Sequence, residues 1–164
     1  MRTIRDVTLV ILTLLSAIGF SQVPRFVQEY EQRLGGALQE ARRQLAQYES
    51  LARNEGLPLE AFWQRLGASG DRSVAAVGRS IGEQAERAAS LGAQAAALER
   101  AGRFMKPLVL LRQHDADLLA ATWAKYEYTL TLDIGFAAAG AVVGPLLNAL
   151  LWAVLLGGRH PRAA

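Results

Sequence analysis

The sequence predicts an all-α membrane protein in which two transmembrane helices flank a long, antiparallel helical-bundle domain that resembles a coiled coil. Hydrophobic residues make up 51% of the 164 residues, and they are most concentrated in two blocks near the ends of the chain. The charged segment between the blocks repeats apolar residues at three- and four-residue steps, which is the helical spacing. No run of residues alternates in the way that predicts a strand.

The two apolar blocks, residues 7–20 and 129–156, are candidates for membrane spans. A helix needs about 20 mostly apolar residues to cross about 30 Å of hydrocarbon. The second block exceeds this length, and the first approaches it only when it is extended to Val23. A basic start followed by a short apolar run also fits a signal peptide cleaved near Gln22. We favour an uncleaved anchor, because residues 22–25 lead directly into a helical pattern.

The charges at the two ends predict the orientation. Arg2 and Arg5 precede the first block, and Arg159 and Arg162 follow the second, as expected of short cytoplasmic tails. The sequence therefore predicts a bacterial inner-membrane protein with both termini in the cytoplasm. Its expected parts are an N-terminal tail (1–6), transmembrane helix 1 (7–24), a periplasmic helical domain (25–128), transmembrane helix 2 (129–156) and a C-terminal tail (157–164).

The net charge does not indicate a nucleic-acid partner. The pI of about 9.7 is high, but residues 25–128 contain almost equal numbers of basic and acidic side chains. The positive excess lies in the tails, so the middle domain offers no basic surface for phosphate groups. The chain has no cysteine, which excludes disulfides and thiolate metal sites.

Three helices are expected in the middle domain. The first carries a stripe from Val27 to Ala52 and ends at Gly56 and Pro58. The second begins after Asp71, a suitable N-cap, and continues the pattern beyond thirty residues. Its expected inward residues are Val74, Val77, Ile81, Ala85, Ala88, Leu91, Ala95, Leu98 and Met105. The third opens at Pro107, runs toward the second span and is expected to turn Leu108, Leu111, Leu118, Leu119 and Thr122 inward.

The chain leaves the membrane after Pro24 and must return to it near Thr129, which restricts the path of these helices. We expect the helix from Asp71 to run parallel to the first helix. The segment around Phe62 would then form a short descending leg of an uneven four-helix bundle. A break near His114, which would add another turn, is the alternative.

Several residues in or near the spans are candidates for a role. Asp133 is expected to form an interfacial ion pair with Arg25, and a proton or ion relay is the alternative, since an acid within a span is costly. Gly140 and Gly144 form a small-residue face for helix packing, either against the first span or between two copies of the chain. Asn148 is expected to hydrogen-bond across that interface.

Other polar and aromatic residues have a structural explanation. His114, Asp115 and Asp117 could suggest a metal site, but two ligands on one helix face do not make one, and a solvated face is favoured. An aromatic belt at the outer interface would comprise Phe26, Tyr30, Trp123, Tyr126 and Tyr128. Phe62 and Trp63 could dock a partner, although core packing is the favoured role.

The sequence predicts no enzyme, because it contains none of the common nucleophile, metalloprotease, phosphate-binding or dinucleotide-binding motifs. No cofactor and no metal are expected. We expect a protein that acts by association, as a scaffold, as an accessory subunit of a membrane complex or as a homo-oligomer, with membrane lipid as its surroundings. The alternative is an oligomeric channel with Asp133 and Asn148 in a polar path.

The stretch from Ser21 to Gln44 resembles a bacterial family known as domain of unknown function 2937. The residues that carry the resemblance are Gln22, Val23, Pro24, Phe26, Tyr30, Gln32 and Arg33, and the regions of Asp71 and Thr122 extend it over most of the chain. The resemblance implies a proteobacterial membrane protein. It implies no activity and no site residues.

Overall fold

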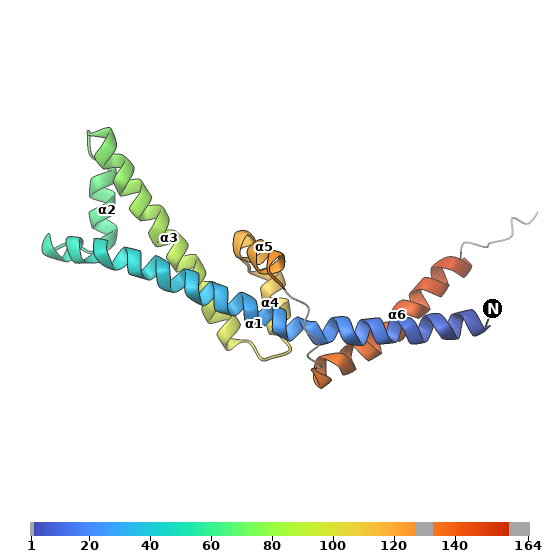
Figure 1. Ribbon diagram of the computed structural model, residues 1–164. Coiled ribbons are helices and arrows are strands. Elements are labelled where there is room, and N and C mark those ends of the chain that lie inside the picture. Colours follow the sequence, from blue (N-terminus) through green and yellow to red (C-terminus); the bar gives the residue numbers. More distant parts are fainter. Residues whose placement is uncertain (1, 127–132, 158–164) are drawn as a thin grey trace, which may run out of the picture. The chain divides into compact units, whose positions relative to one another are not determined.

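A computed structural model describes residues 2–126 and 133–157 of the chain. Within these residues all of the regular secondary structure is α-helical and there is no strand (Figure 1). The helices are α1 (Arg2–Asn54), α2 (Leu59–Gly67), α3 (Arg72–Arg100), α4 (Lys106–Arg112), α5 (Ala116–Ala124) and α6 (Ile134–Gly157).

Helix α1 continues through Pro24, where the sequence predicted the boundary between a span and the first helix of the middle domain. A proline inside a helix removes one backbone hydrogen bond, but it does not end the helix where neighbouring turns remain supported. Helix α1 ends where expected, because Gly56 adopts a left-handed conformation (φ 70°) that glycine tolerates at a helix C-terminus. A single helix therefore contributes to both parts of the protein.

The chain divides into two compact units. The membrane-type unit contains residues 2–27 of α1, Tyr126 and the described residues up to 157, which include α6. The helical unit contains residues 28–125, namely the rest of α1 and helices α2 to α5. The names membrane-type unit and helical unit are used below for these two parts.

In the helical unit, α3 runs antiparallel to α1. Tyr30 contacts Gln94, whereas Leu38, further along α1, lies against Gly92, earlier in α3. The core continues in the same direction through Leu45, Ala52, Ile81 and Ala88. The expected parallel direction of this helix is therefore wrong. The chain turns back at α2, which leads from the end of α1 to the start of α3 (Figure 1).

Helix α2 lies very close to α3, and the residues of α3 at the contact are glycines. A Cβ atom added at Gly78 would lie 2.7 Å from the carbonyl oxygen of Trp63, and one at Gly82 would lie 3.1 Å from the Trp63 ring. Val74 and Val77, which were expected to point inward, are exposed instead. The hydrophobic pattern placed the wrong face inward here, because close backbone contact selects the smallest residues.

Tyr30 links three segments of the helical unit and is fully buried, with 0% of its surface exposed. Its hydroxyl donates to Oε1 of Gln94 in α3 over 3.0 Å and accepts the backbone N–H of Asp115 over 2.9 Å. Burial raises the pKa of this hydroxyl above its ordinary value, and the hydrogen bond from Asp115 opposes part of that effect. The start of α5 is thereby tied to α1.

The third helix of the middle domain is broken at residues 113–115, which is the alternative that the sequence left open. Asp115 caps α5 by accepting the N–H of Leu118 over 3.0 Å. Within α4, Leu111 is 75% exposed and Leu110 is buried, so the inward face of this helix is not the expected one. Thr122 is buried as expected, whereas Leu108 and Met105 are exposed.

We expect Gly78→Ala to destabilise the helical unit by about 1–3 kcal/mol, because the new methyl group overlaps the backbone of α2. Thermal unfolding of the detergent-solubilised full chain, followed by circular dichroism, measures the effect. Gly36→Ala is the control, since nothing lies near its Cβ position, and it should raise stability by roughly 0.5–1 kcal/mol. Equal effects of the two substitutions would contradict the close approach of α2.

We expect Tyr30→Phe to lower the stability of the helical unit by about 1–3 kcal/mol at neutral pH, because the N–H of Asp115 and the amide oxygen of Gln94 both lose their partner. Chemical unfolding of the full chain in detergent measures this loss. Tyr48→Phe, at a half-buried position of the same helix, should change stability little.

The raised pKa of Tyr30 predicts a loss of stability in alkali. Above the ordinary value of 10.0 the unfolded chain loses this proton first, so the contribution of Tyr30 is complete below that pH and declines as pH rises toward the folded-state pKa. Unfolding free energies measured from pH 9 upward should fall less steeply in Tyr30→Phe than in Tyr48→Phe. Identical slopes would contradict the assignment.

Candidate functional site

The interface between α6 and the first part of α1 brings together most of the residues that the sequence selected in the spans (Figure 1). Both helices are long and apolar enough to cross a membrane. Their large apolar side chains are mostly exposed, which is unusual for a surface in water. Examples are Val7, Val10, Ile11, Leu14, Val142, Leu146, Leu150 and Val154.

Glycines of α6 allow the two helices to touch along their backbones. A Cβ atom added at Gly140 would lie 2.8 Å from Cα of Ala17 and would overlap the carbonyl oxygen of Ser16. One added at Gly144 would lie 2.9 Å from the backbone nitrogen of Thr13. The small-residue face therefore packs within the chain, which is one of the two arrangements that the sequence left open.

A cluster of polar side chains lies at one end of this interface. The Thr8 hydroxyl accepts a hydrogen bond from Nε1 of Trp152 over 3.2 Å and lies 3.0 Å from Oδ1 of Asn148, to which it can donate. It also lies 2.9 Å from the carbonyl oxygen of Arg5. Asn148 is only 6% exposed, and its expected hydrogen bond across the interface is present. Thr8 and Trp152 were missed, because neither stands out in an apolar block without its partner.

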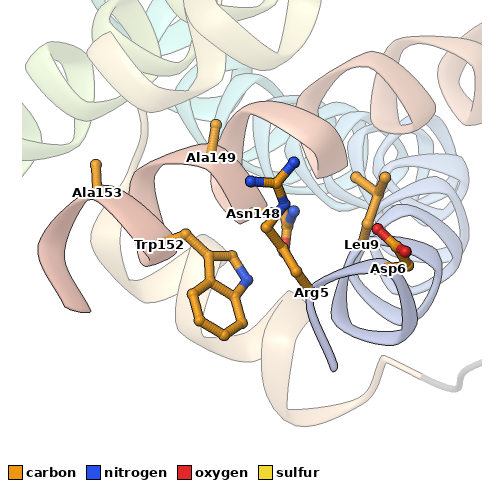
Figure 2. A pocket seen from close by; sticks show the side chains of 7 residues that line it. All are labelled: Arg5, Asp6, Leu9, Asn148, Ala149, Trp152 and Ala153. Carbon is orange, nitrogen blue, oxygen red and sulfur yellow. The ribbon is translucent and has the colours of Figure 1, made fainter. Parts of the chain in front are cut away.

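An open pocket of about 680 Å³ lies beside this cluster of polar side chains. Arg5, Asp6 and Leu9 line it from α1, and Asn148, Ala149, Trp152 and Ala153 line it from α6 (Figure 2). In Figure 2 the side chains of Asp6 and Leu9 lie on the α1 side and the Trp152 ring on the α6 side, with the side chains of Arg5 and Asn148 between them in the view. The pocket thus combines a cation, an acid, an amide and an aromatic ring within one unit.

Asp133 stands immediately before α6, where the sequence had placed it about one turn inside the second span. Its Oδ1 accepts the backbone N–H groups of Gly135 and Phe136, over 3.1 and 3.3 Å. These bonds cap the helix and place a negative charge at the positive end of its dipole. The ion pair of Asp133 with Arg25 stays a prediction.

An aromatic contact joins α1 to the segment that precedes α6. Tyr126 donates to the Gln22 carbonyl over 3.2 Å, and its ring meets Phe26 edge-on, with centroids 5.5 Å apart. Two members of the expected aromatic belt therefore lie together. Tyr128 lies outside the described residues, and Trp123 is largely exposed on α5.

Phe62 and Trp63 lie in the core of the helical unit. Phe62 is 7% exposed, and the Trp63 ring covers Gly82. The pair therefore packs the core, and its proposed docking role finds no exposed surface at Phe62. Exposed apolar side chains occur elsewhere, in a set that the sequence assigned inward, assigned to the aromatic belt or passed over: Phe104, Met105, Leu108, Leu111 and Trp123. This set is called the α4–α5 apolar set below.

His114, Asp115 and Asp117 do not gather as metal ligands. Nδ1 of His114 lies 3.0 Å from the Leu110 carbonyl, while Asp115 caps α5 and faces Arg87 at 3.8 Å. Within the part of the chain that the structure describes, no group of three or more His, Asp or Glu side chains is placed to hold an ion.

Comparison with known proteins identifies a family. The model of the family described as protein of unknown function (DUF2937) matches residues 4–163. No curated protein and no solved structure matches the chain.

We expect Thr8→Val to weaken the association of α1 with α6 by roughly 0.5–2 kcal/mol, because Trp152 loses an acceptor and Asn148 a donor. Thermal unfolding in detergent micelles, monitored by tryptophan fluorescence, measures the loss. Thr3→Val is the matched control on the exposed side of the same helix. A similar loss in both variants would show that Thr8 does not bridge the helices.

Proposed function

We infer that this chain, which belongs to the DUF2937 family of proteins of unknown function, is a non-enzymatic inner-membrane protein that acts by association. Helices α1 and α6 would anchor it, with both termini in the cytoplasm. The helical unit would stand in the periplasm and bind another membrane protein complex or further copies of the chain. The basic residues at both ends of the sequence support this orientation.

The lipid environment is supported by the way in which the two apolar helices pack. Their contact is made by small residues and a few hydrogen bonds, and their large apolar side chains point outward. Such packing is typical of helices in lipid, where burial of large apolar side chains provides little driving force.

The α4–α5 apolar set is the observation that carries the association. Leu108 and Leu111 lie three residues apart on α4 and so share a face, and Phe104 and Met105 immediately precede that helix. Arg112 and Lys125 are exposed charged residues nearby in the sequence. Large apolar side chains with a polar rim are typical of a protein interface.

A channel remains the alternative function, with Asp133 and Asn148 in a polar path. The contacts of these residues favour it less, because Asp133 caps α6 and Asn148 bonds to Thr8 inside the helix pair. Asp133→Asn in proteoliposomes tests it: altered ion or proton flux with unchanged assembly would support the channel and oppose a purely associative role.

Cross-linking mass spectrometry on native membranes that contain the tagged full chain tests the association. We expect reproducible cross-links from Lys106 or Lys125, the lysines nearest the α4–α5 apolar set in sequence, either to a second membrane protein or to a second copy. The double substitution Leu108→Ser and Leu111→Ser should lower their yield about tenfold, since loss of two exposed apolar contacts removes on the order of 1–3 kcal/mol of binding.

Val77→Ser is the matched control, because Val77 is an exposed apolar residue of α3 in the same unit. It should leave the cross-links unchanged. A strictly monomeric protein without reproducible partners would refute the proposed function. An equal loss of cross-links in both variants would show that α4 does not form the interface.

A further inference from the structure

The pocket at the start of α1 and the end of α6 has the chemistry of a phospholipid headgroup site. Arg5 and Asp6 lie in the first two turns of α1, and Trp152 lies in the last two turns of α6. The pocket therefore opens at one end of the apolar helix pair. Tryptophan is enriched at this depth, where a ring can contact both acyl chains and polar headgroups.

The polar groups of the pocket provide donors on one side. Asn148 is more than nine-tenths buried, and its Oδ1 lies 3.0 Å from the Thr8 hydroxyl, which can donate to it. Its amide NH₂ group, which has no partner among the described residues, is therefore available to the pocket. The guanidinium of Arg5 adds up to five N–H donors, and it forms no ion pair with the residues that the structure describes. Two donor groups that line the same pocket suit a phosphate ester.

The remaining lining distinguishes between headgroups. Asp6 contributes a carboxylate, which accepts hydrogen bonds from an ammonium group and repels a second anion. The indole N–H of Trp152 is directed to Thr8, so its ring offers the pocket only an apolar and cation-attracting face. Leu9, Ala149 and Ala153 provide an apolar wall for the upper part of an acyl chain.

We propose that this pocket binds a phospholipid that carries both a phosphate and a primary ammonium group, as in phosphatidylethanolamine. Arg5 and Asn148 hold the phosphate, Asp6 accepts the ammonium, and Trp152 packs against the headgroup. The proposal rests on the proposed membrane location. A lipid fits the pocket better than a soluble phosphate ester, because the apolar wall and the surrounding exposed apolar residues suit acyl chains.

Native mass spectrometry of the full chain tests the site, with protein released from nanodiscs that contain equal amounts of phosphatidylethanolamine, phosphatidylglycerol and phosphatidylcholine. The wild-type protein should retain the ethanolamine lipid preferentially. Arg5→Gln should lower that retention about tenfold, since a charge-assisted hydrogen bond to phosphate is lost. Arg43→Gln, at an arginine whose side chain is 76% exposed in the helical unit, should not change it.

Asp6→Asn provides a result that misfolding cannot imitate. Loss of the carboxylate should weaken retention of the ethanolamine lipid and strengthen retention of phosphatidylglycerol, because repulsion of the anionic headgroup disappears. Equal retention of all three lipids by the wild type, or an unchanged profile in both variants, would overturn the site. Equally strong competition by glycerophosphoethanolamine, which has no acyl chains, would show a soluble ligand and overturn the lipid assignment.

Alkaline carbonate extraction of native membranes that contain the full chain separates this proposal from the proposed function. Release of the protein into the soluble fraction would refute the membrane location itself. Retention in the membrane without preference among the lipids would overturn only the headgroup site.

Discussion

The helical unit depends on one buried hydroxyl. Tyr30 projects from α1 into a site without solvent access, where a phenol is stable only if its oxygen is hydrogen-bonded. Gln94 and the backbone of Asp115 satisfy that requirement, and so the position of α3 and the start of α5 are both set relative to α1. The break at residues 113–115 follows, because Asp115 must turn its N–H toward Tyr30 while its carboxylate caps α5.

Glycine serves the same purpose in both units. Gly78 and Gly82 allow α2 to lie on α3, and Gly140 and Gly144 allow α6 to lie on α1. At Gly78, Gly140 and Gly144 the backbones approach to a distance that a methyl group would prevent, and at Gly82 the ring of Trp63 takes the place of a side chain. The residues that carry the family resemblance are also structural: Gln22 and Phe26 hold Tyr126, and Tyr30 holds Asp115. These three residues are spaced four apart and lie on one face of α1.

Much of the helical architecture could be predicted. The stripe from Val27 to Ala52, the cap at Asp71 and the stop at Gly56 are local features, and the structure has each of them. The direction of α3 and the inward face at its start were wrong. Direction depends on the turn made by α2, and the inward face on how close α2 lies, and neither can be seen in one helix alone. The same limit applies to Leu111, because the face of α4 that points inward depends on what packs against that helix.

The sequence by itself determined the helical class, the two apolar segments and the small-residue face of α6, because periodicity, length and residue size act through neighbouring turns of the same helix. Only the tertiary structure decided what these faces touch. It brought Thr8 to Asn148 and Trp152, some 140 residues away in the chain, and placed Arg5 and Asp6 beside them in one pocket. Such contacts join distant segments of the chain. A hydrogen bond between two of them does not alter the spacing of apolar residues in either segment, so the sequence pattern does not predict it.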